Sequence, residues 1–210
     1  RDLESELGAS LGGTREALRS FRLQATDDPH RFGALEALAK SHFLFDNRLQ
    51  ILVDGEAAFN SLFQGIAAAR QYVLVQTYIL RDDEVGRALQ DRLIEQAEAG
   101  LAVYLLYDEI GSYALPNAYV EKLADAGVSV HRFHSTRGSG NRFQFNFRNH
   151  RKLLVTDGAH GWLGGFNIAS EYLGTDARIG AWRDTHLRVD GPAALNLQHS
   201  FVEDWYWATG

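Results

Sequence analysis

From residue 47 onward, the hydrophobic positions follow two periods, one typical of buried strands and one typical of amphipathic helices. Short runs such as YVLVQTYIL and LAVYLLYD are apolar on both faces, which favours a sheet covered on both sides. Strands that alternate with helices indicate βαβ units, so the pattern predicts an α/β fold with a mixed, mostly parallel sheet flanked by helices on both faces. The predicted strands are 48–55, 72–80, 101–108, 128–133, 150–157, 161–165 and 182–191, and the predicted helices are 56–70, 84–100, 117–127 and 192–207.

The remaining segments divide the chain into an appendage and one domain. Residues 1–46 are rich in Ala, Leu and charge around a Gly12-Gly13 break, which predicts short amphipathic helices. Residues 134–149 contain Gly, Ser and Arg and show no hydrophobic period, and they are predicted to form a loop over the candidate site at residues 150–167. We therefore expect a helical N-terminal appendage at 1–46 and one α/β domain at 47–210.

Composition excludes several classes of function. The chain has no cysteine, which rules out disulfides, thiolate zinc sites and Cys nucleophiles. No apolar run approaches the ~18 residues that would span a bilayer. A formal net charge of -6 argues against a protein that coats nucleic acid through a general basic surface.

The charge is nevertheless unevenly distributed. No Asp or Glu occurs between Asp125 and Asp157, whereas five arginines and Lys152 fall there. This block indicates either a local anion site or a solvated basic loop. His131 and His134 have a spacing that could suit a metal, but no carboxylate is adjacent, so we expect no metal site.

Within this block, the spacing of a few residues points to phosphate chemistry. Strand alternation would place His150 and Lys152 on one face, and Asp157-Gly158 is a dipeptide favoured in hairpin turns. An imidazole beside an ammonium suits a phosphate, because one group can attack or move a proton while the other neutralises oxygen charge. Gly164-Gly165-Phe166-Asn167 follows at a short fixed distance.

These residues resemble the signature of the phospholipase D superfamily, His-x-Lys, four residues, Asp, six residues, Gly-Ser-x-Asn. Gly165 stands where many members have Ser, which removes one hydroxyl donor and leaves the backbone N–H to bind phosphate. Blocks over residues 47–210 look like the N-terminal half of bacterial cardiolipin synthases, as in NRLQILVDGEAAFNSLFQGIAAAR, LLYDEIGS and FRNHRKLLVTDG.

The resemblance implies a reaction that needs no metal or cofactor. A motif His attacks a phosphodiester to give a phosphohistidine, and a second motif His protonates the leaving alcohol. Carried over to this chain, the catalytic residues are His150, Lys152 and Asp157, with Asp157 more an orienting residue of the hairpin than a chemical participant. Asn167 and Gly165 would bind phosphate, and Asp184 would stand near the place of the acidic partner of the motif His.

For a cardiolipin synthase, two phosphatidylglycerol molecules give cardiolipin and glycerol. The implied partners are anionic phospholipid and a membrane surface, with no nucleic acid, and the implied location is the bacterial cytoplasmic membrane. The family needs two motifs, and none of the other seven histidines here has a Lys two residues later. A second motif-bearing half or a homodimer partner is therefore expected. The alternatives are a dimeric phosphodiesterase that cleaves nucleic acid and a catalytically incomplete half that only binds phosphate.

Overall fold

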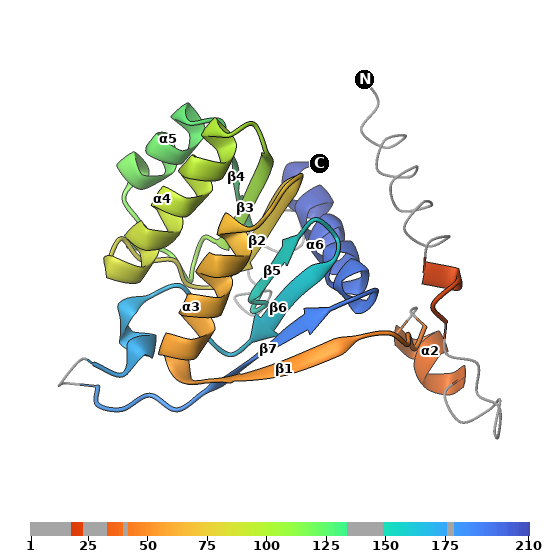
Figure 1. Ribbon diagram of the computed structural model, residues 1–210. Coiled ribbons are helices and arrows are strands. Elements are labelled where there is room, and N and C mark those ends of the chain that lie inside the picture. Colours follow the sequence, from red (N-terminus) through yellow and green to blue (C-terminus); the bar gives the residue numbers. More distant parts are fainter. Residues whose placement is uncertain (1–17, 23–32, 40–41, 134–148, 176–178) are drawn as a thin grey trace, which may run out of the picture.

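The computed structural model describes residues 18–22, 33–39, 42–133, 149–175 and 179–210. These residues form one seven-stranded sheet with the strand order β1-β7-β6-β5-β2-β3-β4 (Figure 1). The strands are β1 (Arg48–Val53), β2 (Tyr72–Thr77), β3 (Ala102–Asp108), β4 (Ser129–Phe133), β5 (Leu153–Thr156), β6 (His160–Gly164) and β7 (Thr185–Asp190). The helices are α2 (Gly33–Ala39), α3 (Asp54–Ala67), α4 (Glu84–Glu98), α5 (Asn117–Asp125), the 3-10 helix η1 (Ser170–Leu173) and α6 (Ala193–Thr209).

The sheet is mixed, but parallel pairing is the minority, which corrects the expectation of a mostly parallel sheet. Only β2–β3 and β3–β4 are parallel, and the other four neighbouring pairs are antiparallel. The reason is that β5, β6 and β7 form an antiparallel meander between β1 and β2. β1 and β2 still point the same way, as their βαβ pattern predicts, but they are not neighbours. Hydrophobic periodicity indicates where strands and helices lie along the chain, but it does not indicate which strands pair.

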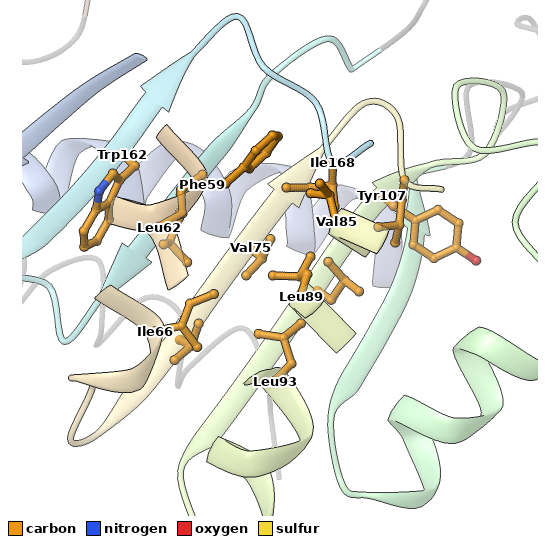
Figure 2. Packing of buried hydrophobic residues seen from close by; sticks show 14 of the residues in the cluster. Phe59, Leu62, Ile66, Val75, Val85, Leu89, Leu93, Tyr107, Trp162 and Ile168 are labelled. Atoms are coloured by element: carbon orange, nitrogen blue, oxygen red, sulfur yellow. The ribbon is translucent and has the colours of Figure 1, made fainter. Parts of the chain in front are cut away.

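Helices cover both faces of the sheet and create two apolar cores. On one face, α3 and α4 pack against the strands, and Figure 2 shows their buried side chains meeting those of the sheet. On the other face, α6 packs against β2 and β4 to β7. The residues that α3 and α4 contribute at the labelled contacts are Phe59, Leu62, Ile66, Val85, Leu89 and Leu93. The second core gathers Phe201 of α6 with Leu74, Leu106, Leu153 and Val155 of the sheet.

Three sequence predictions are matched only in part by the described residues. The strand predicted at 150–157 is shorter, because β5 begins at Leu153, so His150 and Lys152 lie in the segment that leads into it. Of the predicted appendage, the structure describes α2 and a few neighbouring residues, and residues 134–148 of the predicted loop lie outside the described part. Among the described residues, no helix is long and apolar enough to cross a membrane.

Candidate active site

Five strand ends meet at one edge of the sheet, and most of the polar residues of the motif lie there. Tyr78 follows β2, Asp108 ends β3, Lys152 precedes β5, Gly164 ends β6 and Asp184 precedes β7. The alternating direction of the meander produces this convergence, because the start of β5 and the end of β6 must face the same edge. Residues that are up to about a hundred positions apart are therefore neighbours.

His150 and Lys152 do point toward one another, as the sequence predicts, although neither lies in a strand. The Lys152 Nζ is 3.0 Å from His150 Nδ1 and 2.8 Å from the His150 carbonyl oxygen. The ring of Tyr78 covers both groups, with its centroid 4.6 Å from the imidazole centroid and 5.2 Å from Lys152 Nζ. Tyr78 was not identified from the sequence, since a tyrosine after an apolar strand carries no distinctive spacing.

The electrostatics of this pair follow from burial. Lys152 is only 7% exposed, and burial lowers its pKa to about 8, partly offset by Asp184 and Asp108. Burial, and then the charge of Lys152, lowers the pKa of His150, and Asp108 opposes this shift. At neutral pH the lysine is therefore an ammonium and the imidazole is neutral. Because an ammonium can only donate, Nδ1 accepts, and we assign the imidazole proton to Nε2.

Asp108 is a buried carboxylate that positions the segment leading to His150. Its Oδ1 accepts hydrogen bonds of 2.9 Å from the backbone N–H groups of Ile110 and Gly111, and its Oδ2 accepts one of 3.3 Å from the N–H of Asn149. It therefore ties the residue before His150 to the end of β3. The sequence held a signal for it, because a carboxylate ends an otherwise apolar strand at the edge where the motif lies.

Asn167 lies at the same edge, and half of its hydrogen-bonding capacity is used within the protein. Its Oδ1 accepts from the backbone N–H of Ile79 at 3.0 Å, and its Nδ2 donates to the Tyr172 hydroxyl. One N–H of the amide remains for a ligand. The side chain thus links the segment after β2 to η1, and its predicted contact with phosphate stays a prediction.

Gly165 does not offer its backbone N–H to a ligand, which corrects the sequence interpretation. That N–H donates to the carbonyl oxygen of Thr185 at 3.2 Å. Position 165 suits a glycine for a steric reason, because a Cβ placed there would overlap the carboxylate of Asp184. A serine at this position would have to displace that carboxylate.

Asp184 acts on Lys152 and His186. Its charge raises the pKa of both groups against their burial, and no described interaction joins it to His150. Its Oδ1 accepts from the N–H of Thr185 at 2.6 Å. His186 is buried against the ring of Phe166, 5.4 Å between centroids, and burial lowers its pKa to about 4. His186 is thus a packed, neutral histidine.

Asp157 lies at the other edge of the sheet, in the turn between β5 and β6. Its carboxylate accepts from the backbone N–H groups of Arg70, Gln71 and Tyr72 at 2.8 to 3.0 Å, which fixes the start of β2. The five residues from Lys152 to Asp157 span about 16 Å when extended. Its inclusion among the catalytic residues is therefore not supported by this geometry, which gives it the orienting role in the hairpin.

Comparison with protein families identifies a match over most of the domain. Residues 62–205 match the family described as Cardiolipin synthase, PLD-like domain. Cardiolipin synthase A of Pseudomonas aeruginosa (strain LESB58) is 52% identical over 176 residues, which are 84% of this chain and 36% of that protein. Cardiolipin synthase A of Pseudomonas putida (strain W619) is 48% identical over the same length, which is 37% of that protein. The chain thus spans little more than a third of these relatives.

Solved structures show the same fold at low sequence identity. Nuc of Salmonella typhimurium, described as a phospholipase D family member, has a TM-score of 0.60 and 15% identity, covering 78% of this chain and 97% of that chain. NucT from Helicobacter pylori has a TM-score of 0.60 and 17% identity, covering 79% and 99%. With the family match over residues 62–205, these findings show that the chain belongs to the phospholipase D-like domains of the cardiolipin synthase family.

Proposed function

We propose that this chain supplies one histidine-lysine half of an active site that converts two phosphatidylglycerol molecules into cardiolipin and glycerol. The observation that carries the proposal is the contact between His150 and the buried ammonium of Lys152 at the sheet edge, in a chain 52% identical to a cardiolipin synthase A. A buried ammonium with few charged partners gains most from a phosphate, because the ligand restores the compensation that burial removed.

The proposed reaction has two displacements at phosphorus. A histidine nitrogen attacks the phosphorus of the first phosphatidylglycerol, a P–N bond forms, and the P–O bond to the head-group glycerol breaks. A second histidine protonates the departing oxygen. The hydroxyl of a second phosphatidylglycerol then attacks the phosphohistidine, giving its proton to that second histidine, and the P–N bond breaks. The second step regenerates both imidazoles.

His150 can serve in either position, and Lys152 selects between them. As the proton donor, His150 would give its Nε2 proton to the leaving oxygen while Nδ1 takes a proton from the Lys152 ammonium, so that the imidazole stays neutral. As the nucleophile, His150 would need the lone pair of Nε2, which requires Lys152 to leave Nδ1 for a phosphate oxygen. Lys152 also has a third N–H beyond its two described hydrogen bonds. Phosphate binding and imidazole tautomer are therefore coupled through this lysine.

A single His150 cannot stand on both sides of an in-line displacement, so the proposed site needs a second motif. The partner is a second histidine-lysine half or, as a weaker option, a second copy of this chain related by twofold symmetry. Because the substrate is a bilayer lipid, we place the reaction at the surface of a bacterial membrane. The nuclease alternative receives less support, because the sequence likeness at 48 to 52% is to cardiolipin synthases.

The test mixes the 210-residue chain with phosphatidylglycerol vesicles and follows cardiolipin and glycerol. We expect no product from the monomer and product once the remaining part of Pseudomonas aeruginosa cardiolipin synthase A is added. His150→Ala in the mixture should remove that activity, while Glu121→Gln on the exposed surface of α5 should not. Single-stranded DNA is incubated in parallel to test the nuclease alternative.

Full activity in a demonstrably monomeric sample would contradict the two-histidine site. Activity that rises with the square of the chain concentration, without the added half, would instead identify the twofold dimer as the partner. Hydrolysis of DNA with no cardiolipin formed would overturn the proposed substrate.

A further inference from the structure

A pocket of about 710 Å³ opens beside His150 on the face of the sheet that α6 covers. The described residues around it come from the end of β4, the segment that leads into β5, and the last two turns of α6. This volume lies within the range of about 300 to 1,000 Å³ that is usual for small-ligand sites. A group attached to a phosphate held at His150 can therefore enter it.

The wall of the pocket has an aromatic side and a polar side. The ring of Trp207 stacks on Phe133, with centroids 4.5 Å apart and planes 21° apart. The polar side of the wall is formed by three charged residues, Arg151, Glu203 and Asp204. Apolar rings with a few polar groups are typical of sites that bind a small organic group and fix its orientation.

Within the part of the chain that the structure describes, the polar side keeps donors and acceptors without a partner. Asp204 is already occupied, because it accepts from Arg151 and, at 2.8 Å, from Gln76 Nε2. The Glu203 carboxylate lies 3.3 Å from His199 Nε2 and its side chain is 61% exposed, so acceptor capacity remains. Arg151 has further N–H groups beyond its bond to Asp204. The Nδ2 of Asn149, a buried residue that also lines the pocket, has no hydrogen-bond partner among the described residues.

The charges divide the region into two parts. The Lys152 ammonium and the His150 ring favour a phosphate, whereas Glu203 and Asp204 repel one. These charges disfavour a second anionic group in the pocket, and a group that both donates to Glu203 and accepts from Arg151 would use both kinds of polar group in its wall. A hydroxyl does both, whereas an ammonium only donates and cannot accept from the N–H groups of Arg151 that lie beyond its bond to Asp204. A short chain of carbons bearing hydroxyls also suits the aromatic side.

We propose that this pocket binds the hydroxyl-bearing glycerol group of the substrate, an inference that rests on the proposed function. The glycerol attached to the reacting phosphate lies against Trp207 and Phe133, and its hydroxyls donate to Glu203 and accept from Arg151. The pocket thus distinguishes a glycerol head group from an amine head group at the residue next to the reacting histidine.

The test measures binding of three acyl-free phosphodiesters to the 210-residue chain by NMR. The ligands are glycerophosphoglycerol, glycerophosphoethanolamine and dimethyl phosphate, which carry the same phosphodiester charge. The signals followed are the His150 imidazole and the Trp207 indole N–H, the latter assigned with Trp207→Phe. We expect all three ligands to shift His150, and only glycerophosphoglycerol to shift Trp207 as well, with about tenfold tighter binding than dimethyl phosphate.

Glu203→Gln and Glu121→Gln form the matched pair of variants. Both remove one exposed carboxylate from a helix, but only Glu203 lines the pocket. Glu203→Gln should weaken glycerophosphoglycerol about fivefold and leave dimethyl phosphate no weaker, whereas Glu121→Gln should change neither.

The outcomes separate the subsite from the proposed function. Equal binding of glycerophosphoglycerol and dimethyl phosphate, both shifting His150, would overturn the glycerol subsite and leave the phosphate site intact. Tighter binding of glycerophosphoethanolamine would overturn the assignment of the pocket to a polyol. A His150 signal that none of the three ligands shifts would overturn the phosphate site and, with it, the subsite.

Discussion

The two ends of β5 carry charges from the same short motif, but the protein holds those charges in opposite ways. At one end, the Lys152 ammonium is buried against an imidazole and a carbonyl, and burial lowers its pKa to about 8. At the other end, burial acts to raise the pKa of Asp157, but three backbone N–H groups outweigh it and hold that pKa below its usual value. One charge is destabilised by the fold, and the other is stabilised by it.

This contrast separates chemistry from architecture within one motif. A carboxylate that accepts three backbone hydrogen bonds has little left to offer a substrate, so Asp157 contributes to the fold. A buried ammonium with incomplete compensation lowers the stability of the free protein and is positioned to gain from an anion. The spacing of the motif thus joins a functional end and a structural end across a single strand.

The largest expected effect comes from removing the charge at the functional end. Lys152→Met should reduce cardiolipin formation by about 10³-fold or more, because the phosphate loses its nearest cation in both the bound state and the transition state. The assay uses the chain with a second motif supplied. Lys122→Met, an exposed lysine on α5, is the matched control and should retain activity. Comparable losses in both variants would remove the distinction between the two lysines.

The next largest effect concerns stability at the structural end. Asp157→Ala should lower the free energy of unfolding by about 3 kcal/mol, because three N–H groups lose their acceptor and an alanine must adopt the positive φ of 55°. Urea unfolding measures it, and Asp157→Asn, which keeps an acceptor and tolerates that φ, should lose less.

Asp157 also predicts an acid dependence. Because the pKa of Asp157 in the folded protein lies below its usual value, its stabilisation is present above that usual value and is lost as the pH falls through the folded pKa. Asp157→Ala should flatten this acid slope. A variant with unchanged stability and lost turnover would show instead that Asp157 takes part in the chemistry.

Lys152, at the functional end, should make the free energy of unfolding depend on pH in the alkaline range instead. Since the pKa of Lys152 falls from 10.5 to about 8 on folding, the unfolded chain binds more protons between those values, and stability should rise as the pH increases through this window. The slope from one proton is at most about 1.4 kcal/mol per pH unit. Thermal unfolding between pH 8 and 10.5 should show the rise in the native chain and a smaller one in Lys152→Met. Parallel curves would mean that the ammonium is well compensated.

The smallest expected effect concerns Asp184, the carboxylate whose charge raises the pKa of Lys152. In Gly165→Ser, the new Cβ must push the Asp184 carboxylate aside, which costs under about 1 kcal/mol because a side chain end can rotate. Losing that carboxylate should lower the pKa of Lys152 further, since Asp184 raises it. An NMR titration of the Lys152 side chain measures the shift, with Asp184→Asn as reference. A pKa that moves in Asp184→Asn alone would show that the serine is accommodated without displacement.

Much of the fold and of the site was accessible from the sequence. The alternation of strands and helices follows from periodicity, and the motif spacing pointed to the contact of His150 with Lys152, although neither residue lies in the strand predicted for them. Three features did not. The order of strands depends on pairing, the burial of Lys152 depends on the Tyr78 ring and on the strands around it, and the Gly165 N–H depends on its partner in β7. Each of these features arises from contacts between segments that are far apart in the sequence, and a local sequence pattern does not reveal such contacts.

The position of the meander also sets an order of events during synthesis. β1 ends at Val53, and its only strand partner among the described residues, β7, begins at Thr185. At about 5 to 20 residues per second, a ribosome needs roughly 7 to 26 s to make the intervening chain. Through that interval β1 has both of its edges open, with apolar Leu49 and Ile51 that stay exposed even in the folded protein. Until β7 emerges, β1 is therefore an unpaired strand that can form aggregation-prone contacts with other chains.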